Sequence, residues 1–106
     1  MIASMAAAQD TPGDAAGKWS ITIHATDAPL NEQWNLKQDG NKITGTAKTT
    51  DMELPFTAKI EGKVLKGNIK DGDMYYEVNM TVVNNDMDGT IKMGKHLFLV
   101  SGKRKS

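Results

Sequence analysis

Cysteine is absent from this 106-residue chain, which excludes disulfides, thiolate metal sites and a cysteine-linked lipid anchor. A surplus of one charge is absent as well, because 13 basic residues balance 13 acidic ones. The basic excess typical of nucleic-acid-binding proteins is therefore missing. No apolar run approaches the roughly 18 residues that a membrane-spanning helix needs. We therefore expect neither a nucleic-acid partner nor a membrane span.

No segment of useful length has apolar residues at the 3.6-residue spacing of an amphipathic helix. From Gly17 onward, apolar residues instead recur at every second position, as in β-strands. Seven turn sequences separate eight such runs. Asp39-Gly40-Asn41 and Asp71-Gly72-Asp73 are examples, and Asp-Gly suits tight hairpins. We predict an all-β domain over residues 17–106, an eight-stranded antiparallel up-and-down β-barrel. An open two-layer sandwich is the structural alternative.

Residues 1–16 have a different composition, rich in Ala, Ser, Pro and Gly and without a period. Ala6-Ala7-Ala8 fits the small-residue cleavage pattern of a secretory signal, although a basic segment and most of an apolar stretch are missing. We interpret residues 1–16 as a flexible leader or a signal-peptide remnant. The signal interpretation favours a secreted or periplasmic protein.

An internal repeat supports the strand count. "ITGT", "LKGN" and "MDGT" place Gly45, Gly67 and Gly89 at intervals of 22 residues, which is one hairpin per repeat. Each glycine shares its face of the strand with apolar neighbours, so we expect it to point inward. An inward glycine permits the strong coiling of a small barrel and leaves room for large residues opposite.

The two ends of the predicted barrel carry a further pattern. Gly17-Lys18-Trp19 opens the first strand and Arg104 closes the last, which resembles the calycin barrels, the lipocalin- and avidin-like group. The resemblance is greatest to a small secreted bacterial β-barrel domain that is found alone or appended to amidohydrolase-type enzymes. It rests on "GKWSITI", "LKQDGNKITGT", "MDGTIKMG" and "SGKRK". It implies a structural plug in which Arg104 packs on Trp19 at the closed end, and it implies no catalytic residue.

The other end of the barrel is the predicted mouth, because it carries the longer loops and no plug. Its inward residues are apolar or aromatic, as a small hydrophobic ligand would require. The predicted ligand-binding residues are Ile23, Trp34, Leu54, Phe56, Ile69, Met74, Tyr76 and Met93, with Ala47 beside them. The alternative is that these side chains simply fill the barrel, with methionine adapting to irregular gaps.

The loops at the mouth are acidic, which would attract a cation or an amine, although solvated loops kept polar for solubility are the simpler interpretation. The acidic residues are Asp27, Glu32, Asp51, Glu53, Asp71 and Asp73. "DGDM" lacks the spacing of a calcium-binding loop, and we expect no metal and no cofactor.

Catalysis is not indicated by any motif in the chain. His24 and His96 both lie near the mouth on neighbouring strands, but His24 has outward parity. No nucleophile–base–acid pattern, phosphate-binding glycine loop or HExxH motif appears. We expect a non-enzymatic protein, with a barrel enzyme of the isomerase or cyclase type as a remote alternative.

The last strand is apolar on both faces. Leu97 and Leu99 lie on one face, Phe98 and Val100 on the other, so one pair must face outside the barrel. We assign Phe98 and Val100 to an outward interaction surface, which the Ala-rich leader, a second copy of the chain in a homo-oligomer or a partner domain would cover. The sequence thus leaves two functions open, an exported binder of a small apolar molecule and an interaction module with a filled core.

Overall fold

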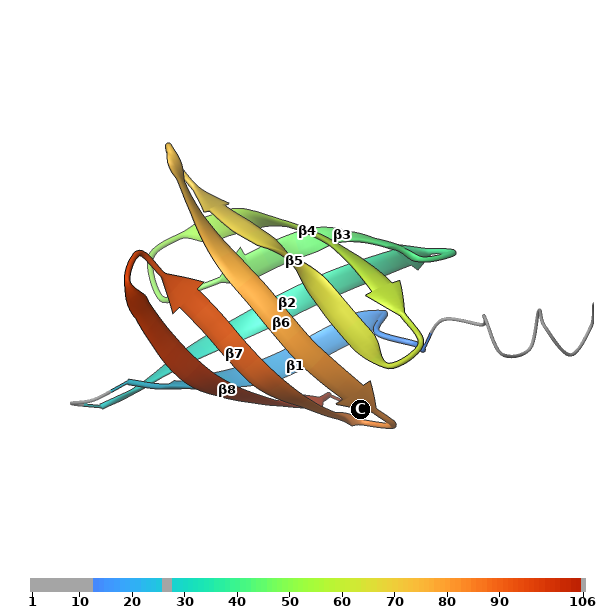
Figure 1. Ribbon diagram of the computed structural model, residues 1–106. Coiled ribbons are helices and arrows are strands. Elements are labelled where there is room, and N and C mark those ends of the chain that lie inside the picture. Colours follow the sequence, from blue (N-terminus) through green and yellow to red (C-terminus); the bar gives the residue numbers. More distant parts are fainter. Residues whose placement is uncertain (1–12, 26–27, 106) are drawn as a thin grey trace, which may run out of the picture.

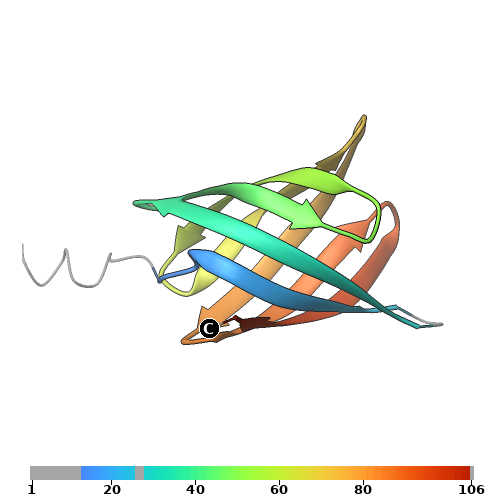
Figure 2. The same ribbon diagram turned by 180° about the vertical axis from the view of Figure 1, so that it is seen from behind.

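The computed structural model describes residues 13–25 and 28–105, and these form a closed barrel in which each strand pairs with its chain neighbours and β8 returns to β1. Every pairing is antiparallel, and the tilted strands wrap around one interior (Figures 1 and 2). The all-β, calycin-like, up-and-down barrel predicted from the sequence is confirmed. The strands are β1 (Gly17–His24), β2 (Pro29–Asp39), β3 (Lys42–Lys48), β4 (Glu53–Glu61), β5 (Val64–Asp71), β6 (Met74–Val83), β7 (Asp86–Met93) and β8 (His96–Arg104).

Tight turns join most of the strands, and their first central residue has a positive φ. Gly40 has a φ of 63° and Asn84 one of 56°, so the β6–β7 turn uses asparagine where the other tight turns use glycine. Asparagine is among the few non-glycine residues that tolerate this backbone region. Because the strands alternate in direction, the turns β2–β3, β4–β5 and β6–β7 all lie at the same end of the barrel, together with the C-terminus of β8. This end of the barrel is at the right of Figure 1.

The core is one continuous cluster of alternate, inward-facing side chains. Its largest fully buried members are Trp19, Trp34 and Phe56. Polar side chains are not found among the fully buried residues of the described ranges. Burial of this apolar face is the main source of stability for such a sheet, at about 25 cal/mol per Å² of apolar surface removed from water.

The repeated glycines lie where neighbouring backbones come closest. A Cβ added at Gly45 would lie 1.9 Å from the carbonyl oxygen of Asn35 on β2, and one at Gly89 would lie 1.9 Å from that of Asn79 on β6. The close approach of the neighbouring backbone leaves room for no side chain larger than that of glycine there. The atoms that exclude a side chain, however, belong to the backbone of the preceding strand rather than to large residues across the barrel.

In the described part of the chain, no helix is long and apolar enough to cross a membrane.

Candidate functional site

The predicted ligand-binding residues fall into three groups by exposure. Ile23, Trp34, Phe56 and Ile69, together with Ala47, are fully buried in the core. Leu54, Tyr76 and Met93 are partly buried and pack against that core from the open end. Met74 differs from the prediction, because it lies at the start of β6 beyond the core and its side chain is 52% exposed.

The barrel interior is filled rather than hollow at the level of the two largest ligand candidates. The rings of Trp34 and Phe56 lie with their centroids 4.9 Å apart and tilted by 49°, a favourable contact between aromatic side chains. Both residues are at most 1% exposed. A ligand reaching them would have to displace the partly buried layer above.

Polar groups gather on the inner side of the open end. The indole Nε1 of Trp34 donates to Glu32 Oε1 at 3.0 Å, and the Tyr76 hydroxyl donates to Asp71 Oδ2 at 2.9 Å. Burial raises the pKa of the Glu32 carboxyl, while the Trp34 hydrogen bond opposes that shift. The hydrogen bond to Asp71 raises the pKa of the Tyr76 hydroxyl, with smaller contributions from burial and from the charges of Asp71 and Glu32.

The acidic residues expected at the mouth do not form a metal site in the described part of the chain, where no group of three His, Cys, Asp or Glu side chains is placed to hold an ion. Asp51, Glu53 and Asp73 are exposed, whereas Glu32 and Asp71 are partly buried. Asp27 lies outside the described residues. Glu32, which we expected only as a loop charge, faces inward, and its parity on β2, shared with Trp34, was the signal for this orientation.

The closed end is built as the resemblance implies. The Arg104 guanidinium carbon lies 4.6 Å from the centre of the Trp19 ring, a cation–π contact. Arg104 also donates to the carbonyl oxygens of Asp14, Ala16 and Asn84, at 2.6, 2.8 and 3.1 Å. Gly17, with a φ of 121°, passes beside the aliphatic part of Arg104.

Residues 13–16, which we assigned to the leader, contact this end of the barrel. Gly13 donates from its backbone to Gly62 at 2.7 Å, and the Gln38 side chain bonds to both Gly13 and Ala15 at 2.8 Å. Ala15 is fully buried and accepts a 2.9 Å hydrogen bond from the indole of Trp19. The predicted cleavage pattern at residues 6–8 lies outside the described residues.

The outward face of β8 is the opposite of the one we predicted. Val100 is only 3% exposed and Phe98 packs against the core, so neither forms an outer surface. Leu97 and Leu99 face outward and are 65% and 68% exposed. The cause is the parity fixed by pairing with β1, because Ile23 lies opposite Val100 and both point into the barrel.

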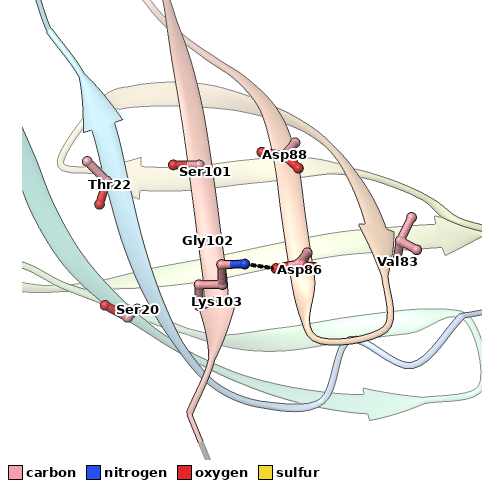
Figure 3. Close-up of a pocket in the computed structure, with 8 residues that line it drawn as sticks. All are labelled: Ser20, Thr22, Val83, Asp86, Asp88, Ser101, Gly102 and Lys103. Carbon is pink, nitrogen blue, oxygen red and sulfur yellow. Dashed lines mark hydrogen bonds and ion pairs between the residues drawn. The ribbon is translucent and has the colours of Figure 1, made fainter.

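A shallow hollow of about 460 Å³ lies on the outer wall across β1, β7 and β8 (Figure 3). Its polar side chains include Ser20, Thr22, Ser101 and Asp88, and Lys103 forms an ion pair with Asp86 across it. The Asp86 hydrogen bond raises the pKa of Lys103. Because this pair is exposed to solvent, it contributes little to stability, and Asp88 lies in the same hollow as a second carboxylate.

The histidines contact different partners. His24 Nε2 lies 3.1 Å from Ser101 Oγ on the outer wall, and His96 lies beside the ring of Phe98, with the ring centroids 6.1 Å apart. The His24–Ser101 contact was not predicted, because it depends on the β1–β8 pairing that closes the barrel. In the described residues no third side chain is hydrogen-bonded to this imidazole.

No family model matches this chain, and no curated protein is significantly similar to it. The function is therefore inferred from the fold and from the positions of the side chains.

Proposed function

We propose that this protein is a non-enzymatic, exported calycin-like domain that works as an interaction module with a filled core and self-associates through the outer face of β8. The observation that carries the proposal is the pair Leu97 and Leu99, the two most exposed of the large apolar side chains described. The packed Trp34–Phe56 layer supports it, because it favours an interaction surface over a ligand in the barrel interior.

The partner that best fits this stripe is a second copy of the chain. Leu97 and Leu99 are two positions apart on one strand, so a two-fold axis between them would place each leucine against the other in the partner copy. The register places Lys92 beside Leu97 and both Thr90 and His24 beside Leu99. These residues would supply the polar rim of a small interface.

The proposed association is weak on energetic grounds. Burying four leucine side chains, two from each copy, contributes about 1.5–3 kcal/mol for each side chain. Association costs about 4–15 kcal/mol in lost translational and rotational freedom. We therefore expect a dissociation constant between about 100 µM and about 1 mM, corresponding to a transient contact.

The His24–Ser101 pair supports a non-enzymatic role rather than a catalytic one. A nucleophile on an enzyme is paired with an oriented base and with donors that stabilise the developing negative charge. The imidazole here is exposed, and its described hydrogen bond goes to Ser101 alone. The backbone around it is engaged in the β1–β8 and β1–β2 ladders.

Analytical ultracentrifugation over a concentration series tests the proposal. The wild-type chain should dimerise reversibly at the highest concentrations, and the double variant Leu97→Ser/Leu99→Ser should stay monomeric. Val64→Ser/Val83→Ser is the matched control, because these valines are also exposed, at 39% and 43%, but lie on other strands. A wild-type chain that is monomeric at millimolar concentration, or equal association of all three proteins, would contradict the proposal.

A further inference from the structure

A cleft opens at the rim of the barrel where β2 and β3 separate. The two strands pair as far as Gln33 and Lys48, but β2 continues along β1 to Pro29. The segment 29–32 therefore has β1 on one side and no strand on the other. The β3–β4 loop, residues 49–52, forms the opposite wall of a cleft of about 490 Å³. The β1–β2 extension and this loop lie at the left of Figure 1.

The loop wall is held in place by its own hydrogen bonds. The backbone N–H of Thr49 donates to the carbonyl of Met52 at 2.8 Å, and the Met52 N–H donates to the Thr49 hydroxyl at 3.1 Å. A ligand would therefore meet a wall that is already ordered, which lowers the entropic cost of binding.

The cleft combines apolar walls with acidic groups. Leu30 and Met52 line it and are 50% and 48% exposed. Glu32 and Asp51 also line it, and its eight lining residues include no Lys, Arg or His. Every second residue of an antiparallel strand turns its N–H and C=O toward the strand edge, so the free edge of segment 29–32 adds backbone carbonyl acceptors beside N–H donors, and the charge of the cleft comes from the carboxylates. Hydrogen-bond acceptors with negative charge suit a ligand that brings donors and positive charge.

The cleft differs from the exposed acidic loops because one of its carboxylates, that of Glu32, is partly buried. Its Oε1 accepts the Trp34 indole hydrogen bond, and no described ion pair involves its carboxylate. It is partly buried, and burial raises the pKa of its carboxyl group. A desolvated carboxylate gains more from a nearby cation than one in bulk water does, because the local dielectric constant is lower.

We propose that this rim cleft binds a small primary ammonium compound with an apolar body. The ammonium group donates to the carboxylates of Glu32 and Asp51, and the apolar body packs between Leu30 and Met52. The ligand lies outside the filled core, so its binding requires no displacement of Trp34 or Phe56. This site is separate from the β8 surface and does not depend on self-association.

The experiment is a two-dimensional 15N–1H NMR titration of the full chain with three probes of equal chain length: n-hexylammonium, n-hexanol and n-hexanoate. Hexylammonium should bind with a dissociation constant of about 1 mM, the scale expected for a ligand of this size. Its chemical-shift changes should centre on residues 29–32 and 49–52. Hexanol should bind at least fivefold more weakly, and hexanoate should cause no saturable change.

Two variants test whether a loss of binding comes from the missing charge of Glu32 or from a change in the fold. Glu32→Gln keeps an acceptor for Trp34 and should weaken hexylammonium binding about tenfold, as expected for the loss of a charged hydrogen-bond partner. Glu53→Gln is the matched control, because Glu53 is exposed on the neighbouring strand β4 and does not line the cleft. The spectrum of each variant reports directly whether it is folded.

Three outcomes would overturn the inference: equal binding of hexanol and hexylammonium, shift changes centred elsewhere, or unchanged affinity in Glu32→Gln. Each of them leaves the β8 proposal standing, because the sedimentation experiment involves other residues.

Discussion

Two buried tryptophans, Trp19 on β1 and Trp34 on β2, are register partners, but their indole N–H groups have acceptors that lie toward opposite ends of the barrel. At the closed end Trp19 donates to the backbone carbonyl of Ala15 and lies under Arg104. At the open end Trp34 donates to the carboxylate of Glu32. Both tryptophans are fully buried. The difference lies in the partner, a fixed backbone group at one end and an ionisable side chain at the other.

The closed end, with its backbone acceptor, is therefore structural, whereas the open end has an ionisable side chain that can bind a proton or a cation. At the closed end Arg104 packs on an aromatic face, donates to three backbone carbonyls and pairs with the Asp14 carboxylate at 3.4 Å. Its Nε has no hydrogen-bond partner in the described residues but is buried, so the side chain offers little to a ligand. At the open end Glu32 is partly buried and has no cation bonded to it in the described residues. Chemistry that needs an external partner is therefore expected at the open end.

The largest predicted effect follows from removing the closed-end charge. Arg104→Met leaves the carbonyls of Asp14, Ala16 and Asn84 without their donor and removes the contact with Trp19. We expect a loss of about 3 kcal/mol in the free energy of unfolding, measured by urea denaturation. Lys103→Met is the matched control on the neighbouring residue. It should change stability little, since its pair with Asp86 is exposed. Similar losses in both variants would show that the plug is not the structural centre of this end.

Much of the closed end could be predicted from the sequence, because it depends on the positions of Gly17, Trp19 and Arg104 at the ends of the first and last strands. The period of two also predicted the eight strands. The orientation of β8 was predicted wrongly, since both of its faces are apolar and periodicity cannot distinguish them. The parity of Arg104 would have resolved it, because Val100 and Phe98 share that parity.

The open end was less predictable, for a physical reason. The Trp34–Glu32 hydrogen bond joins residues two positions apart on the same face of one strand, so it could have been predicted from the sequence. The rim cleft depends on how far β2 continues beyond the end of β3, and the His24–Ser101 contact depends on the register that closes the barrel. Strand lengths and the register that closes the barrel depend on how all eight strands tilt and stagger together, which a local sequence pattern does not show.

An intermediate effect is expected when the two tryptophans receive the same substitution. Trp19→Phe should cost about 2 kcal/mol, because it leaves the buried Ala15 carbonyl unpaired and weakens the contact with Arg104. Trp34→Phe should cost about 1–2 kcal/mol less, since the Glu32 carboxylate can turn toward water. Urea denaturation measures both costs. Loss of the indole hydrogen bond should also raise the pKa of Glu32 further, which 13C NMR of the carboxyl group detects. Equal costs would show that ring volume, rather than the acceptor, decides the stability of both ends.

The smallest effect is expected for Glu32→Gln in the absence of ligand, and it should be stabilising. Because burial raises the folded-state pKa of Glu32, the folded chain holds this proton more tightly than the unfolded chain does. The stability contributed by Glu32 is therefore greatest below its ordinary pKa and is lost as the pH rises through the raised value. At neutral pH the variant should be more stable than the wild type by less than about 1 kcal/mol. This advantage should disappear below about pH 4, where the wild-type carboxyl is protonated in both states. Thermal unfolding across this pH range measures the difference. An advantage that stays constant with pH would mean that Glu32 is as well solvated as the acidic residues on the exposed loops.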